Sequence, residues 1–89
     1  MSVTVQLPLP MRQAADGQER IQLEADTVGQ AVEALCSRYG QLRNRLYKPT
    51  GRLKGSITIF VNNAQPAAKA DTTLQDGDTL IILQPVGGG

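Results

Sequence analysis

Alternating apolar and polar residues at the start of the chain predict two β-strands joined as a hairpin. Residues 2–7 alternate strictly, which places every second, apolar side chain on one face of a strand. Pro8 ends this strand, because proline has no backbone N–H to donate to a neighbouring strand. Residues 19–24 alternate again after Asp16 and Gly17, a pair typical of hairpin turns. The simplest arrangement is a hairpin.

A helix is predicted next, and both of its ends can be read from the sequence. Thr27 and Gln30 have the spacing of a capping box, in which the two side chains satisfy free backbone N–H groups of the first turn. Gly40 is expected just beyond the helix in a left-handed conformation, which glycine adopts readily. Helical spacing gathers the apolar side chains on one arc of this helix: Val28, Ala31, Val32, Leu35, Cys36 and Tyr39.

The second half of the chain predicts two more strands. Residues 41–47 are a short apolar and basic segment that predicts one helical turn, and residues 56–62 alternate as a third strand. Residues 64–73 are irregular and leave room for a short edge strand. Residues 76–78, Asp-Gly-Asp, form a sharp turn into a last strand over residues 79–84. The order is therefore strand, strand, helix, strand, irregular connection and strand.

This order predicts an α+β fold of the β-grasp type over residues 1–84. One helix cannot bury its apolar face alone, so it should cover one face of a four- to five-stranded mixed sheet. The first and last strands are expected to be parallel neighbours, because a hairpin and a helical crossover separate them. The side chains expected under the helix are Val3, Val5, Ile21, Leu23, Ile57, Ile59, Val61, Leu80 and Ile82.

Composition excludes several kinds of chemistry. The chain has 89 residues, a single cysteine and no histidine, so a zinc site, a disulfide framework, a Ser-His-Asp triad and a Cys-His pair are unavailable within it. We expect no metal site. One unpaired cysteine fits a reducing compartment, so the expected location is cytoplasmic. No apolar run approaches the ~20 residues of a membrane span, and we expect no membrane partner.

Basic side chains gather in the middle of the chain. Residues 34–70 hold seven Lys and Arg residues and no Asp or Glu, although the net charge of the whole chain is only +1. The favoured interpretation is a solvated basic face, and docking to an acidic partner is the alternative. We expect no nucleic acid as a partner, because the sequence shows no glycine- and aromatic-rich platform for stacking bases, and Tyr47 is the only aromatic residue within the basic stretch 43–54. Cys36 is interpreted as a small buried hydrophobic residue of the helix.

The chain ends in Pro-Val-Gly-Gly-Gly, residues 85–89. Glycine has no Cβ, so such a segment predicts a flexible tail that could pass through a narrow channel and present the Gly89 carboxylate. A frayed terminus without a function is the alternative.

These features together resemble the MoaD/ThiS family of ubiquitin-like sulfur carriers. The matching segments are residues 3–5, residues 28–35, Ile-Phe-Val-Asn at 59–62, Thr-Leu-Gln-Asp-Gly-Asp at 73–78, and the terminal residues 85–89. The resemblance implies a carrier rather than an enzyme, with no cofactor bound by this chain. A ubiquitin-activating (E1-like) partner would use ATP to adenylate Gly89, and sulfur would convert the adenylate into a thiocarboxylate. Gly88 would permit access to the partner's active site.

The resemblance is strongest to the CysO-type carriers, which pass sulfur to an enzyme of cysteine synthesis. Residues 42–47, 51–53 and 60–62 carry it. A molybdopterin synthase small subunit is the alternative, although residues 6–12 depart from the aromatic and basic pattern of that group. Thiamine-type carriers are usually shorter, and a carrier for tRNA thiolation stays open. A plain ubiquitin-like interaction module, whose tail does nothing, is the alternative of another class.

Partner docking is expected on the sheet face that the helix does not cover. Most strand residues of this face are polar, but Phe60, Ile81 and Leu83 are apolar and lie near the tail. With Gly87 they form the predicted docking site for the activating and sulfur-accepting enzymes. Scattered surface hydrophobic residues are the alternative interpretation. We expect the free protein to be a monomer.

Overall fold

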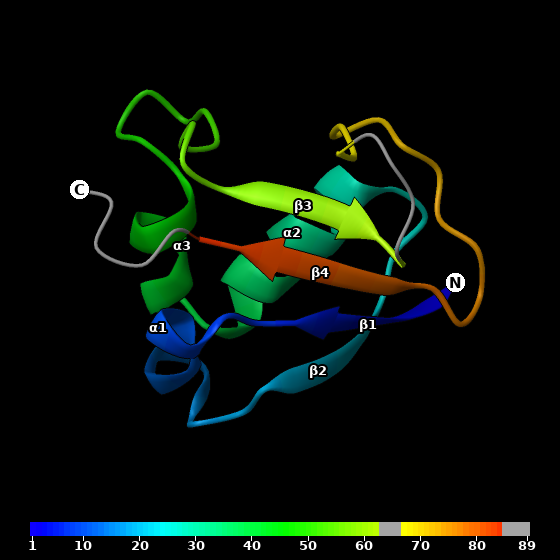
Figure 1. Cartoon of the computed structure of the whole chain (residues 1–89), viewed down its shortest axis with the longest axis horizontal. Helices are drawn as coiled ribbons and strands as arrows, with labels where there is room; N and C mark the ends of the chain where they lie inside the picture. The colour runs from blue at the N-terminus through cyan, green and yellow to red at the C-terminus, as the bar shows by residue number, and fades with distance from the viewer. Residues whose placement is uncertain (63–66, 85–89) are drawn as a thin grey trace.

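The computed structural model describes residues 1–62 and 67–84 (Figure 1). Its elements are β1 (Ser2–Gln6), α1 (Leu9–Arg12), a 3₁₀ turn (Gln13–Ala15), β2 (Arg20–Glu24), α2 (Val28–Arg38), α3 (Gln41–Leu46), β3 (Thr58–Val61) and β4 (Thr79–Leu83). The four strands form one sheet in the order β2-β1-β4-β3. Figure 1 shows α2 behind this sheet, while α1 and α3 lie beyond its end. The predicted β-grasp fold is confirmed.

The strand register confirms that the first and last strands are parallel neighbours. β1 pairs with β2 in antiparallel fashion and with β4 in parallel fashion, and Val5 lies opposite Leu80. β3 adds to the other side of β4 as an antiparallel edge strand, with Ile59 opposite Ile82. β4 is therefore a central strand, and its two faces have different roles because successive side chains point to opposite sides.

The core fills the space between the sheet and α2. Alternate strand residues point into it, and they meet the buried face of the helix. The largest fully buried side chains are Leu7, Met11, Leu35, Leu42, Leu46, Leu74, Leu80 and Ile82. Val61 was expected among the strand residues buried under the helix, but it is only partly buried. It is the last residue of the edge strand β3, and a strand with one neighbour is covered from one side only.

The connection between β1 and β2 differs from the predicted hairpin turn. The chain forms α1 and the 3₁₀ turn, and Met11 and Ala15 of this segment are buried. Asp16 and Gly17 do adopt positive φ angles of 57° and 79°. They end a helical turn, because the Gly17 N–H donates to the carbonyl of Arg12 at 2.7 Å. Helical pieces this short leave no periodic signal in a sequence.

The start of α2 follows the predicted capping pair with one change. Thr27 Oγ1 accepts a hydrogen bond from the Gln30 N–H at 3.2 Å. The Gln30 side chain reaches back one residue further than a capping box requires, and its Oε1 accepts from the Asp26 N–H at 2.9 Å. The end of α2 was predicted wrongly. Gly40 has the right-handed angles φ −57° and ψ −29°, because it caps the N-terminus of α3 instead of reversing the chain.

Helix α3 confirms the helical turn predicted after α2 and anchors the loop that follows it. Leu42 and Leu46 are fully buried, so one face of this short helix is part of the core. After the helix, Tyr47 and Leu53 form an isolated antiparallel bridge. The bridge closes a small loop whose two sides are held together.

Candidate partner-binding site at the end of the sheet

The exit of β4 defines where any tail must leave the folded body. Thr58 lies opposite Leu83 in the antiparallel register of β3 and β4, so the end of β4 and the beginning of β3 lie at the same end of the sheet. In Figure 1 the β4 arrow points toward α3. Gly87, Gly88 and Gly89, the predicted reactive and docking glycines, lie outside the described residues, and their roles stay predictions.

The three apolar residues predicted for docking lie on the open face of the sheet. Phe60 on β3 and Ile81 on β4 are direct cross-strand partners. Leu83 follows two residues along β4 on the same face, and it is 46% exposed. Phe60 and Ile81 are half-buried. The structure therefore brings the three side chains together as one small apolar surface beside the exit of β4, which we call the apolar patch.

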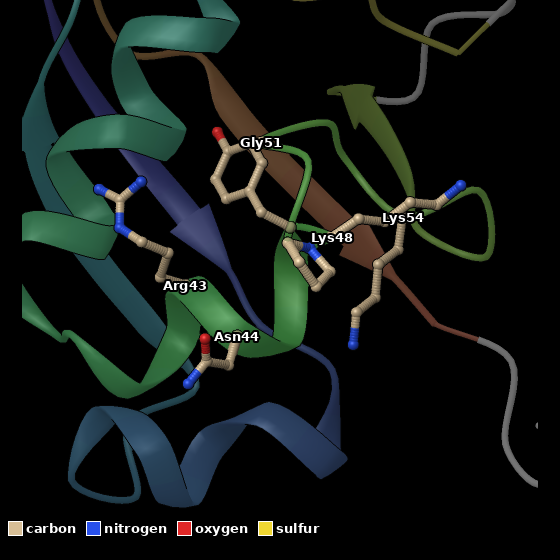
Figure 2. Close-up of a pocket in the computed structure, with 7 residues that line it drawn as sticks. Arg43, Asn44, Lys48, Gly51 and Lys54 are labelled. Carbon is tan, nitrogen blue, oxygen red and sulfur yellow. The ribbon is translucent and has the colours of Figure 1, made fainter.

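A basic cleft lies at the same end of the molecule. Its volume is about 570 Å³, and it is lined by Arg43, Asn44, Tyr47, Lys48, Pro49, Gly51 and Lys54. Figure 2 shows Arg43 and Asn44, from α3, on one flank and the two lysines on the other. The positive charge of this region can be read from the sequence, but the cleft cannot. The signal was the pair of lysines on either side of the Pro49 to Gly51 turn.

The cations of the cleft differ in their partners. Arg43 Nη1 donates to Glu33 Oε2 at 3.2 Å, and its guanidinium lies 5.8 Å from the centre of the Tyr47 ring. Its charge is thus partly neutralised by a neighbouring helix. Lys48 and Lys54 form no ion pair with any residue of 1–62 or 67–84. The uncompensated charge of the cleft comes from these two lysines.

Cys36 is a core residue, as its place on the helix predicted. It is 2% exposed, and desolvation by burial raises the pKa of its thiol. Arg43 opposes this shift and Glu33 adds to it. Burial likewise raises the pKa of the Tyr47 hydroxyl. The thiolate is the reactive form of cysteine, so a thiol that is buried and protonated at neutral pH is unsuited to handling sulfur.

The acidic residues around the last turn act as structural hydrogen-bond acceptors. Asp78 Oδ2 accepts from the Gln75 N–H at 2.8 Å, and Asp76 Oδ1 accepts from the Ser2 N–H at 2.8 Å. The first bond closes the turn before β4, and the second ties this turn to the start of β1. Across residues 1–62 and 67–84, no three His, Cys, Asp or Glu side chains lie close enough to bind a metal ion. The helices in this part of the chain are all too short to cross a membrane.

Fold and register together define a ubiquitin-like β-grasp protein, with its first and last strands parallel and adjacent. A profile of the ThiS family matches residues 5–89. The sulfur carrier protein CysO of Mycobacterium tuberculosis is 32% identical, and the alignment covers 100% of both chains. This chain belongs to the ThiS family.

Two solved structures show the same architecture. The crystal structure of SAMP1, a small archaeal modifier protein from Haloferax volcanii, has a TM-score of 0.89 at 28% identity, with 100% of both chains covered. A chain in the crystal structure of the Amycolatopsis orientalis BexX/CysO complex has a TM-score of 0.84 at 30% identity, covering 98% of this chain and 99% of that one. The described body is thus similar to carriers and to modifiers of this size.

Proposed function

We propose that the protein is a sulfur carrier whose Gly89 carboxylate is the group that becomes charged with sulfur. The observation that carries this proposal is the extent of the family match, which runs from residue 5 through Gly89. The full-length similarity to CysO, a sulfur carrier protein, supports it. So does the composition, since a chain without histidine leaves acid–base chemistry to its partners.

The chemistry requires activation, because a carboxylate shares its charge over two oxygens and has no good leaving group. In the proposed first step, a Gly89 carboxylate oxygen attacks the α-phosphorus of ATP on an E1-like enzyme, and pyrophosphate leaves. Hydrosulfide then attacks the acyl carbon, a C–S bond forms, and AMP leaves. The thiocarboxylate sulfur is a soft nucleophile like a thiolate. It attacks the acceptor's electrophile, and hydrolysis of the acyl C–S bond restores the carboxylate.

The acceptor in this proposal is a biosynthetic enzyme that makes cysteine or a related sulfur metabolite. The relatives named CysO support this choice over the molybdopterin pathway. A solved structure of a putative molybdopterin converting factor subunit is only 22% identical, a level that indicates a shared fold alone. The segment after β1, which the molybdopterin group was expected to fill with aromatic and basic residues, here forms α1.

Intact-mass measurement tests the proposal directly. The protein is incubated with the cognate E1-like enzyme, ATP and sulfide. We expect its mass to rise by the difference between one sulfur and one oxygen atom, and we expect no rise when ATP is omitted. An unchanged mass with an enzyme that charges its own known carrier under the same conditions contradicts the proposal.

A protein modifier is the second candidate, because the body is also similar to a small archaeal modifier protein. The same adenylate would then react with a lysine amine of a target protein, forming an amide bond and releasing AMP. Omitting sulfide and adding an extract of the source cells separates the two functions. A modifier forms covalent adducts that survive reducing agents, whereas a carrier forms none.

The apolar patch provides a prediction about binding to the activating enzyme. Phe60→Ala and Leu83→Ser should each weaken the complex by about 1–2 kcal/mol, or roughly 5- to 30-fold in Kd, because each removes apolar contact area next to the tail. Thr4→Ala, on the same face of the neighbouring strand β1, is the matched control and should change Kd little. Titration of the enzyme checks this. Equal Kd values for all three variants would show that the patch does not dock.

A further inference from the structure

Backbone hydrogen bonds hold the loop that carries Lys48 and Lys54 of the basic cleft. The Lys48 N–H donates to the Arg52 carbonyl at 2.7 Å, and the Lys54 N–H donates to the Leu46 carbonyl at 2.8 Å. Gly51 turns the loop with a φ of 87°, and its N–H donates to the Lys48 carbonyl at 2.9 Å. Leu46 is fully buried in the core. The backbone that carries both lysines is therefore held in place by the folded body.

The loop that carries these lysines leads into β3 beside the exit of β4. The Ile57 N–H donates to the Lys54 carbonyl at 3.0 Å, and the next residue, Thr58, lies opposite Leu83. Figure 2 shows Lys54 above the end of β4. Five residues follow Gln84, and an extended chain spans at most about 3.5 Å per residue, or roughly 17 Å. Any enzyme that holds Gly89 in its active site must approach this end of the body closely.

Within residues 1–62 and 67–84, no ion pair balances the charge of the two cleft lysines. Residues 34–70 contain no acidic side chain, and Glu33 of α2 is paired with Arg43. Lys48 is exposed and Lys54 is half-buried. A cluster of like charges without counter-charges creates a local positive potential, and such a potential attracts and orients an acidic partner.

We propose that the basic cleft docks an acidic protein surface of the activating enzyme, next to the opening that admits the tail. This inference rests on the proposed function and names the charge of the partner surface. A nucleic acid fits less well, because the Tyr47 ring is half-buried and already contacted by Arg43, whereas single-stranded nucleic acids stack on exposed rings. A small anion fits less well, because Arg43 points away from Lys54 in Figure 2.

Charge reversal tests the inference. The variant Lys48→Glu/Lys54→Glu is compared with Arg20→Glu/Lys69→Glu, which makes the same change of charge at exposed positions that do not line the cleft. The initial rate of thiocarboxylate formation is measured against carrier concentration. For the cleft variant we expect KM to rise about tenfold or more, since electrostatic steering contributes that much to association, with kcat unchanged. The control should shift KM less than about twofold.

Two further measurements make the test independent of any folding defect. Lys48→Gln/Lys54→Gln removes the charges without adding carboxylates beside a half-buried position, and its KM should lie between those of the wild type and the charge-reversal variant. For the wild type, KM should rise with ionic strength, because the Debye length falls from about 30 Å at 0.01 M to about 3 Å at 1 M. The KM of the charge-reversal variant should not rise.

The outcomes separate the inference from the proposed function. A wild-type KM that is insensitive to salt, or equal KM values for the cleft variant and its control, overturns the docking surface while leaving the sulfur carrier intact. Loss of tRNA binding in the cleft variant with an unchanged KM assigns the cleft to nucleic acid and also overturns the inference. Absence of any thiocarboxylate from the wild type overturns both.

Discussion

Deletion of Gly89 should abolish thiocarboxylate formation while leaving the folded body unchanged. The deletion withdraws the terminal carboxylate by one residue, about 3.5 Å, and displacements of even about 1 Å can cost a reaction a hundredfold. The last described strand, β4, ends at Leu83, so the deletion removes none of the described contacts. Intact-mass analysis after incubation with the E1-like enzyme, ATP and sulfide measures the effect.

A second variant distinguishes the effect of tail length from the effect of side-chain size at residue 89. Gly89→Ala keeps the carboxylate at the same distance and adds one methyl group, so it should retain some conversion at a reduced rate if the partner's channel is narrow. The thermal unfolding midpoint of both variants should equal that of the wild type. Conversion of the deleted chain at the wild-type rate would mean that Gly89 is not the charged residue.

The second large effect is expected in the centre of the sheet. Leu80→Ala should lower the free energy of unfolding by about 2–5 kcal/mol, because it removes a fully buried side chain and leaves a cavity. Leu80 lies on β4 between Val5 of β1 and Val61 of β3, so the loss affects three strands at once. Small domains are stable by about 5–15 kcal/mol in total, so the loss is a large share. Urea unfolding measures it.

Leu83→Ala provides a control with the same side chain on the same strand. Leu83 points to the open face and is 46% exposed, so its replacement should lower the free energy of unfolding by less than about 1 kcal/mol. The two leucines thus separate stability from docking: Leu80 supports the fold and Leu83 the proposed interface. Similar unfolding midpoints for the two variants would contradict the assignment of the strand faces.

The main strands and α2 could be predicted because their signals are local and periodic. Alternation placed Val5 and Ile59 toward the core, and the structure buries both. Thr27 caps α2 as predicted, since an N-cap depends on residues only three positions apart. The segment between β1 and β2 escaped prediction, because α1 and the 3₁₀ turn are too short to show a period. Gly40 was assigned the wrong role because glycine serves several kinds of helix junction.

The candidate site, too, could be predicted from the sequence only in part. The three residues of the apolar patch could be identified from alternation, because successive side chains of a strand point to opposite faces and these three fall on the face away from the helix. Their direct contact with one another depends on the register, which pairs Phe60 with Ile81. The basic cleft could be anticipated only as a charge run. Its shape arises where α3 and the loop closed by Tyr47 and Leu53 come together.

By itself, the sequence determined the class of fold, the buried faces of its strands and the family resemblance that points to Gly89. These follow from side-chain periodicity and from motifs a few residues long. Only the tertiary structure decided that Lys54, in the loop that also holds Lys48, lies beside the end of β4. That placement follows from the long-range pairing of Thr58 with Leu83, and pairing between distant segments depends on how the whole core packs.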